Sequence, residues 1–261
     1  MIGRRKLPQG YLAWNAKWGA PAGKRLTRFV PWHLRTRGPF RRLLGPVAFQ
    51  PNSETRACEY PWAFHAAKLQ PGMCCMEVGG GLSGFQFALA RSGMKVINVD
   101  PGESAAGKGW PVDQRSIERL NRSFGTDVEL RNCTLAEAGV APASVDRVFS
   151  ISTIEHIPTS ELPEVMRGIA EVLKPGGACV LTVDLFLNLK PFSKRETNHY
   201  GTNVDVRALI EASGLELESG ERSELYGFDE FDTEPILAHL EDFYVGTYPA
   251  VAQAFVLRKP E

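Results

Sequence analysis

The sequence has few cysteines, no long apolar run and, in its first fifty residues, no acidic side chain. Its five cysteines include no C-x-x-C pair, so we expect neither a disulfide framework nor a zinc site. No stretch of about eighteen apolar residues is present, which argues against a transmembrane helix. The basic start of the chain lacks the apolar segment of a secretory signal peptide. These absences predict a cytoplasmic protein with reduced cysteines.

The charged residues that are present are divided unevenly along the chain. Residues 1–50 contain 11 Lys or Arg and no Asp or Glu, although the 261-residue chain has a formal net charge of zero. Five prolines interrupt this stretch, and aromatic residues are interleaved with the cations. This composition predicts a partly ordered, basic extension over residues 1–52 that packs its Trp and Phe side chains on a main domain, residues 53–261.

The basic extension has several candidate roles. Clustered cations could recognise an anionic acceptor, contact a nucleic acid or form a peripheral contact with an acidic membrane surface. They could equally form a solvated face that offsets the acidic remainder of the chain. The sequence does not decide between these roles, and it does not indicate an oligomeric state.

The main domain alternates between strand and helix patterns. Short apolar runs predict parallel strands, and the segments between them have helical periodicity. The predicted strands are residues 73–78, 95–99, 128–131, 145–151, 178–184, 215–218 and 252–258, and the predicted helices are residues 53–69, 85–92, 114–124, 161–173 and 204–213. This order predicts an α/β fold with a Rossmann-like, doubly wound sheet of about seven strands and a terminal antiparallel hairpin. Residues 220–249 form a predicted insertion near the substrate site.

A glycine turn follows the first predicted strand. Gly79, Gly81 and Gly84 satisfy G-x-G-x-x-G, and Asp100 follows the second strand, 19 residues after Gly81. Glycine allows the backbone to turn tightly and to approach a ligand closely. By itself, this pattern fits a nicotinamide dinucleotide site as well as any other nucleotide site.

Four motifs together are more specific than the glycines alone. They are Glu77-Val78-Gly79-Gly80-Gly81, Val99-Asp100-Pro101, Ser152-Thr153-Ile154-Glu155-His156-Ile157 and Leu173-Lys174-Pro175-Gly176-Gly177. In their order and spacing, these motifs resemble those of the class I S-adenosylmethionine-dependent methyltransferases, and the resemblance covers roughly residues 70–258. The resemblance implies S-adenosyl-L-methionine as cofactor. The cofactor contacts that it implies are Glu77, Gly79, Gly80, Gly81, Ser83, Asp100, Pro101, Thr134 and Ser152.

The resemblance also implies a role for each part of the site. Glu77 would lie near the amino acid moiety of the cofactor, and Asp100 would hold the ribose hydroxyls. The sequence departs from the family at two positions. Ser83 stands where the third glycine is common, and Thr134 stands near the usual acidic partner of the adenine amino group.

The Glu155-His156 pair would lie near the methyl donor in such an enzyme. His156 is the candidate general base because the ordinary pKa of histidine, about 6.5, lies near working pH. Glu155 would orient the cofactor, the substrate or the imidazole, and His199 is a second catalytic candidate. Packing of His156 without a chemical role is the alternative. Asp184 and Asn188 could offer oxygen ligands to magnesium, but no spaced carboxylate cluster accompanies them, so no metal is predicted.

We therefore expect in-line methyl transfer to an oxygen of a small-molecule, saccharide or lipid-linked acceptor. An RNA or protein methyltransferase that uses the basic extension is a weaker alternative. The Asn-Pro-Pro-Tyr type motif of base amino-group methyltransferases is missing after the fourth strand, where Ser152-Thr153-Ile154-Glu155 stands. An NAD-dependent oxidoreductase and a non-catalytic binding protein of the same fold are the remaining alternatives.

Overall fold

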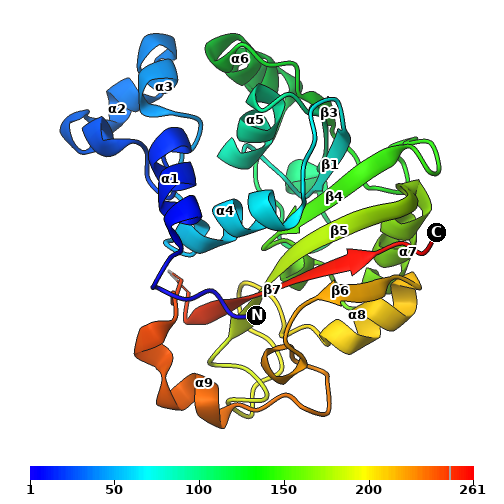
Figure 1. The fold of residues 1–261 in the computed structure, drawn as a ribbon. Coiled ribbons are helices and arrows are strands. Elements are labelled where there is room, and N and C mark those ends of the chain that lie inside the picture. Colours follow the sequence, from blue (N-terminus) through cyan, green and yellow to red (C-terminus); the bar gives the residue numbers. More distant parts are fainter. Residues whose placement is uncertain (247) are drawn as a thin grey trace.

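The computed structural model describes residues 1–246 and 248–261. Its centre is a seven-stranded sheet with the order β3-β2-β1-β4-β5-β7-β6 (Figure 1). The strands are β1 (Cys74–Val78), β2 (Lys95–Val99), β3 (Glu129–Arg131), β4 (Val145–Ile151), β5 (Leu173–Phe186), β6 (Glu216–Ser219) and β7 (Ala250–Arg258). The first five strands are parallel, whereas β7 is antiparallel to both of its neighbours. The predicted α/β sheet with a closing antiparallel pair is therefore confirmed.

The sheet reverses its order at β1. This strand pairs with β2 on one side and with β4 on the other, so the connections leave it in opposite directions. The carboxyl ends of β1 and β4 consequently border a crevice that no crossover connection fills. The fold thus brings the glycine turn and the Glu155-His156 motif to the same edge of the sheet.

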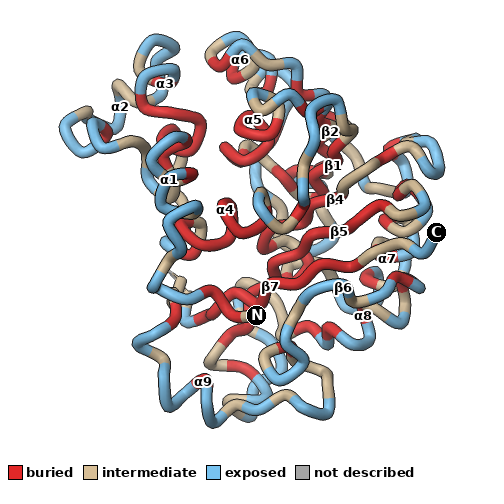
Figure 2. The backbone as a smooth tube through the Cα atoms, viewed as in Figure 1, coloured by how far each residue is buried: buried red, intermediate tan, exposed pale blue. Residues whose placement is uncertain are grey.

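Helices cover both faces of the sheet. One apolar core lies under α1 (Gln9–Trp18), α4 (Arg56–Ala66), α5 (Gly84–Arg91) and α6 (Gln114–Phe124), and the other lies under α7 (Leu162–Val172) and α8 (Val206–Ser213). Figure 2 shows that the central strands and much of α4 are buried between these layers. In the part of the chain that is described, no helix combines the length and apolar character needed to cross a membrane.

Helix α6 illustrates how local sequence sets these elements. Ile117, Leu120 and Phe124 are buried, and their spacing places them on one face of the helix. The Asp113 side chain caps the first turn by accepting a hydrogen bond from the Ser116 amide at 2.8 Å. Gly125, with φ of 65°, ends the helix in the left-handed conformation.

Most predicted boundaries lie within about two residues of those in the structure, and two elements differ by more. The fifth strand begins at Leu173, which pairs with Val145, and the Lys174–Gly177 segment bulges out before pairing resumes at Ala178. The helix predicted for residues 53–69 is shorter, spanning Arg56–Ala66. In both cases the residues at the ends carry turn or cap geometry that periodicity does not reveal.

The N-terminal extension contributes to the core. It contains α1, η1 (Arg25–Phe29), α2 (Trp32–Arg35) and α3 (Gly38–Leu44). Trp14 and Trp18 of α1 are each 4% exposed and lie in the apolar core of one sheet face. In contrast, Phe29 and Trp32 are 70% and 48% exposed. The extension therefore has a packed part and a projecting part (Figure 2).

The predicted insertion, residues 220–249, lies beside the N-terminal end of β7. It includes η4 (Arg222–Glu224), α9 (Glu234–Ala238) and η5 (Leu240–Asp242), and residue 247 lies outside the described residues. Ile236 and Phe243 bury their side chains against Ile2, Leu185 and Val251. This small apolar cluster attaches the segment to the sheet.

Replacement of Trp14 tests whether the extension is part of the cooperative core. Its ring lies 6.3 Å from the Tyr60 ring and 6.2 Å from the Phe85 ring, between centroids. We expect Trp14→Ala to lower the free energy of unfolding by about 3–5 kcal/mol, because it leaves a cavity in the core. Urea unfolding measures the change. The exposed Trp32→Ala is the matched control, with an expected change within about 0.5 kcal/mol, and equal effects of the two variants would contradict a packed α1.

Candidate active site

A cavity of about 400 Å³ lies beyond the carboxyl ends of the parallel strands, beside the crevice at β1. This is the usual ligand position in open α/β sheets, and the size is typical of small-molecule sites. Nearly all of the residues predicted for the site line the cavity, namely Glu77, Gly79, Gly80, Gly81, Ser83, Asp100, Pro101, Thr134, Ser152 and His156. Glu155 and His199 do not line it.

The glycine turn after β1 has no room for side chains. Gly79 and Gly81 have φ values of 70° and 51°, in the left-handed region. A Cβ atom on Gly79 would also overlap the side chain of Thr153, in the turn after β4. The turns after β1 and β4 are therefore packed closely together, and a ligand above them meets backbone amides.

Glu77, the penultimate residue of β1, is buried, at 1% exposure. The Ser83 hydroxyl lies 3.0 Å and 3.1 Å from the two carboxyl oxygens, to which it can donate a hydrogen bond. Burial raises the pKa of Glu77 to about 8, although the Ser83 hydrogen bond and the Arg56 charge act against this. Ser83, where the sequence departs from the family pattern, thus holds the Glu77 carboxyl beside the N-terminus of α5.

Asp100 joins the turns that follow β1 and β2. One carboxyl oxygen accepts a hydrogen bond from the Gly81 amide, and the other accepts one from the Gly102 amide, each at 2.6 Å. Burial raises the pKa of Asp100, while both backbone hydrogen bonds lower it. The carboxylate is fixed at the cavity wall, where it can accept hydrogen bonds from ligand hydroxyls.

Thr134 lies at the far wall of the cavity, next to Leu135. Its hydroxyl donates a hydrogen bond to the Glu137 carboxylate at 2.7 Å, so this position does carry a nearby acid. Glu137 does not line the cavity, however. An adenine ring at this wall would contact Thr134 and Leu135.

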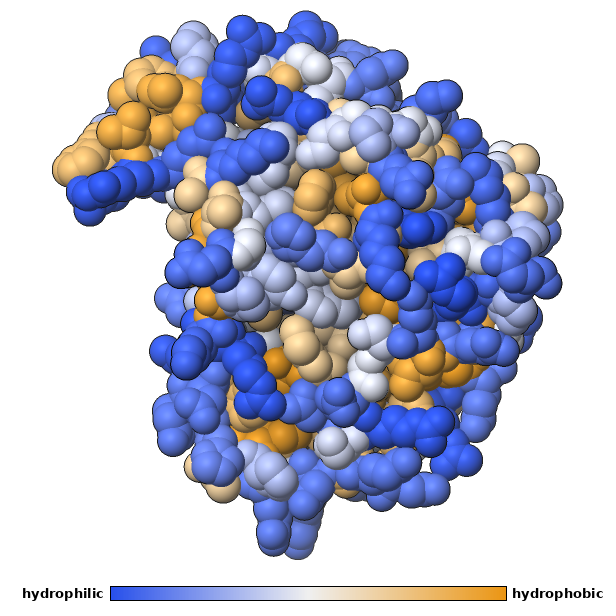
Figure 3. Space-filling model, in the orientation of Figure 1, coloured by the Kyte–Doolittle hydropathy of each residue, from blue (hydrophilic) through white to orange (hydrophobic). Residues whose placement is uncertain are grey.

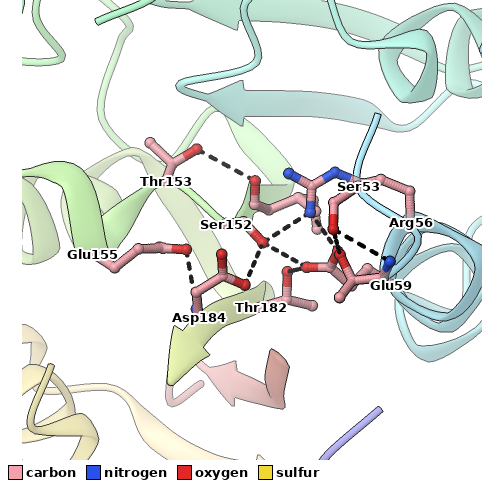
Figure 4. Close-up of polar contacts among 10 residues, drawn as sticks. Ser53, Arg56, Glu59, Ser152, Thr153, Glu155, Thr182 and Asp184 are labelled. Carbon is pink, nitrogen blue, oxygen red and sulfur yellow. Dashed lines mark hydrogen bonds and ion pairs between the residues drawn. The ribbon is translucent and has the colours of Figure 1, made fainter. Parts of the chain in front are cut away.

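A polar cluster lies against the cavity, which its members Arg56 and Ser152 line (Figure 4). Arg56 of α4 forms an ion pair with Glu59 and donates a hydrogen bond to the Ser152 hydroxyl at 2.8 Å. Glu59 accepts further hydrogen bonds, each 2.6 Å long, from the hydroxyls of Ser152 and Thr182. The Arg56 charge and these hydroxyls lower the pKa of Glu59 despite its burial. The cluster ties α4 to β4 and β5.

Asp184 and Glu155 lie next to this cluster, in the order seen in Figure 4. Glu155 is fully buried and accepts a hydrogen bond from the Asp184 amide at 3.0 Å. Burial raises the pKa of Glu155 to about 8, and burial with the charges of Glu155 and Glu59 raises that of Asp184 well above its ordinary value. Of the two carboxyl groups, only that of Asp184 lines the cavity. Glu155, which the sequence predicts to orient the cofactor, the substrate or the imidazole, instead contacts the backbone of Asp184 and does not line the cavity.

His156 lines the cavity in a fixed orientation. Its Nδ1 atom is hydrogen-bonded to the backbone carbonyl of Tyr200, and its ring centroid lies 4.8 Å from that of Trp110. Because a carbonyl only accepts hydrogen bonds, Nδ1 carries the hydrogen, and in the neutral ring Nε2 is the proton acceptor. Burial lowers the pKa of His156, so the neutral ring is favoured near pH 7. This is the protonation state that a general base requires.

The other two candidates lie outside the cavity. His199 is exposed, and its Nε2 atom lies 2.7 Å from the Lys108 ammonium, which does line the cavity. Asn188, considered with Asp184 as a metal ligand, accepts a hydrogen bond from Asn198 at 3.3 Å. Among residues 1–246 and 248–261, no group of three or more His, Cys, Asp or Glu is arranged to hold a metal ion. His199 therefore contacts the site indirectly, through Lys108 and through Tyr200, whose ring centroid lies 5.1 Å from that of His199.

The sequence did not indicate several residues of the site. Arg56 and Glu59 have the i, i+3 spacing of a helical ion pair, but this spacing does not show that the pair lies inside the protein. Trp110 and Tyr248 line the cavity from segments without a motif. Only the folded chain brings these residues next to the turns that follow β1 and β4.

Residues 76–181 match the family model for a methyltransferase domain. Over 223 residues the chain is 26% identical to the ubiquinone biosynthesis O-methyltransferase of Rhizobium etli, a match that covers 79% of this chain and 80% of that protein. Two solved structures share the fold at 16% identity. One is the cyclase SpnF, with a TM-score of 0.56 and coverage of 90% of this chain and 96% of that chain. The other is the Burkholderia thailandensis 1,6-didemethyltoxoflavin-N1-methyltransferase with bound S-adenosylhomocysteine, with a TM-score of 0.52 and coverage of 76% of each chain.

The raised pKa of Glu155 predicts a pH dependence of stability. Between about pH 4.5 and pH 8 the carboxyl is protonated in the native state and ionised in the unfolded state, so the free energy of unfolding falls as pH rises. Glu155→Gln removes this proton, and we expect the slope to become less negative by up to about 1.4 kcal/mol per pH unit. Urea unfolding across this range measures both slopes. Exposed Glu164→Gln should leave the slope unchanged, and parallel slopes for Glu155→Gln and the wild type would contradict a neutral buried carboxyl.

Proposed function

The chain is a class I S-adenosylmethionine-dependent methyltransferase, and from this premise we propose that it methylates a hydroxyl oxygen of a small-molecule acceptor. The observation that carries this proposal is the orientation of His156. Its Nδ1 atom is committed to the Tyr200 carbonyl, so the neutral ring can take a proton only at Nε2. A hydroxyl nucleophile benefits from such a base, since it loses its proton as it attacks.

The cavity fits the proposed cofactor contacts. Glu77 would face the amino acid moiety, Asp100 the ribose hydroxyls and Thr134 the adenine, while the glycine turn offers backbone amides. When bound, S-adenosyl-L-methionine supplies an electrophilic methyl group. The chain's own contribution is to hold the acceptor oxygen in line with that methyl group and to accept its proton.

The charge of the cavity argues against the dinucleotide alternative. In a dinucleotide site, the diphosphate lies at the N-terminus of the helix after the glycine turn. Here the Glu77 carboxyl occupies that position, held by Ser83 at the start of α5. A diphosphate would place its negative charges beside Asp100 and disfavour ionisation of the Glu77 carboxyl, whereas a cationic cofactor would favour the ionised form of both groups.

The acceptor end of the cavity supports a small organic molecule. Trp110 and Tyr248 offer flat apolar surfaces there, and Asp184, Arg56 and Lys108 offer polar contacts. The name of the Rhizobium etli relative specifies O-methylation, and the same reaction fits a histidine base. Saccharide and lipid-linked hydroxyls belong to the same proposal, since they present the same nucleophile.

Thermal unfolding with added ligands tests the cofactor assignment. S-adenosylhomocysteine at about 100 times its Kd should stabilise the native state by about 2.7 kcal/mol and raise Tm, whereas NAD should not. Asp100→Asn removes a charged acceptor at the cavity wall, so its affinity for S-adenosylhomocysteine should fall by about 10- to 100-fold. A larger shift with NAD than with S-adenosylhomocysteine would reverse the assignment.

Replacement of His156 tests the base. We expect His156→Gln to lower kcat by about 10²- to 10⁴-fold with little change in the affinity for S-adenosylhomocysteine. The wild-type rate should fall as pH drops through the lowered pKa of His156, and the variant should lose this limb. Labelled-methyl transfer to a panel of phenols, sugars and lipid-linked alcohols provides the assay.

His199→Gln is the matched histidine variant for this test, because His199 lies outside the cavity. We expect it to change kcat by less than about threefold, as expected for a residue without proton transfer. If only His199→Gln lost activity, the general base would be His199, in the loop after β5.

A further inference from the structure

Residues 25–43 form an arm that projects from the body of the protein and includes η1, α2 and most of α3 (Figure 1). Among the described residues, seven large hydrophobic side chains are exposed, and four of them are on this arm. They are Leu26 at 54%, Phe29 at 70%, Trp32 at 48% and Leu43 at 53% exposure. Figure 3 shows hydrophobic surface gathered on the arm, next to strongly hydrophilic surface. Such a grouping marks an interaction surface.

Cations accompany both exposed aromatic rings of the arm. The Arg28 guanidinium carbon lies 4.6 Å from the centroid of the Phe29 ring, and that of Arg35 lies 5.6 Å from the Trp32 ring. The arm carries no acidic residue at all. Aromatic rings with adjacent cations suit the boundary between acyl chains and anionic headgroups, where each part of the side chain finds its preferred surroundings.

A groove between α3 and α6 adjoins the arm and is lined by four arginines, Arg41, Arg42, Arg119 and Arg122. Arg41 is only 8% exposed, and its buried Nε atom has no hydrogen-bond partner among the described residues. No carboxylate of the described residues lies within 4.0 Å of any of the four. Burial and the charge of Arg119 lower the pKa of Arg41, which reflects this lack of a counter-ion. The groove therefore has the donors and the charge for a phosphate group.

We propose that the arm and the arginine groove dock this protein on the surface of an anionic phospholipid membrane. The groove holds headgroup phosphate, and Leu26, Phe29 and Trp32 enter the outer edge of the acyl region. A nucleic acid also offers phosphates, but it has no hydrocarbon phase in which to bury an exposed leucine. The combination of aliphatic and cationic side chains therefore favours a lipid surface.

The arm is firmly connected to the active site. Residues 50–53, which follow it in the chain, line the cavity, and the Pro46 carbonyl packs against Gly84 at the start of α5. A Cβ atom on Gly84 would overlap that carbonyl. Docking through the arm would thus bring the cavity close to the membrane surface, where a lipid-linked acceptor would be found.

Vesicle flotation tests this proposal with the full chain. We expect binding to vesicles of phosphatidylcholine mixed with phosphatidylglycerol, weakening as salt is added, and little binding to phosphatidylcholine alone. Each arginine near an anionic surface contributes about a fivefold change in partitioning, so Arg119→Gln with Arg122→Gln should weaken binding about 25-fold. Phe29→Ser with Trp32→Ser should weaken it at least about tenfold.

The matched control removes two exposed arginines outside the arm and the groove, Arg167→Gln with Arg195→Gln, and should bind vesicles like the wild type. The response of Tm to S-adenosylhomocysteine shows that each variant is folded. Because flotation measures no activity, its result does not depend on the proposed O-methylation.

Several results would overturn the proposal. Two of them concern vesicles: equal binding to neutral and anionic vesicles, and loss of binding in the control variant. Two others concern a protein that does not bind vesicles. It would bind a single-stranded RNA instead, or it would form concentration-dependent dimers that need Phe29 and Trp32. Glycerol 3-phosphate separates the two sources of phosphate. A rise in Tm with this probe that requires Arg119 and Arg122, in a protein that does not float with vesicles, would assign the groove to a soluble phosphate and would also overturn docking.

Discussion

The structure of the active site depends on one partly buried cation. Arg56 lies among the carboxyl groups of Glu59, Glu155 and Asp184, and its ion pair with Glu59 connects α4 to the ends of β4 and β5. A buried pair of this kind gains little net stability over apolar packing, but the loss of one partner leaves an uncompensated charge. Because Arg56 supplies the only basic side chain of this cluster, the remaining carboxyl groups balance their charge by protonation.

A second constraint is steric. The turn after β1 lies so close to the turn after β4 that Gly79 cannot carry a side chain, and α5 begins so close to the N-terminal extension that Gly84 cannot either. The cavity wall is therefore assembled from three separate parts of the chain. Trp14, which packs with Tyr60 and Phe85, fixes the extension to the same layer. The extension is thus a structural part of the site.

The sequence predicted the sheet well because a strand buried on both faces is an apolar run that is visible without any tertiary information. Much of the cavity lining was also predictable, since residues such as Glu77, Asp100 and Ser152 lie within a few positions of strand ends. Arg56, Trp110 and Tyr248 were not, because they reach the cavity from segments whose positions depend on packing. The pair Glu155-His156 shows the limit most clearly. Its two neighbouring side chains separate on folding, so that His156 lines the cavity and Glu155 lies behind Asp184.

The raised pKa of Glu77 links ligand binding to the release of a proton. Even with the Arg56 charge acting on it, this carboxyl is largely protonated below about pH 8. An ammonium group placed next to it would favour the ionised form, so an amino acid moiety bound as proposed would displace a proton. Binding of the cofactor would then replace the proton on Glu77 with an ammonium group beside it. At a fixed cofactor concentration the occupied fraction would then rise with pH, and the acidity of the surroundings would help to decide how much enzyme is loaded.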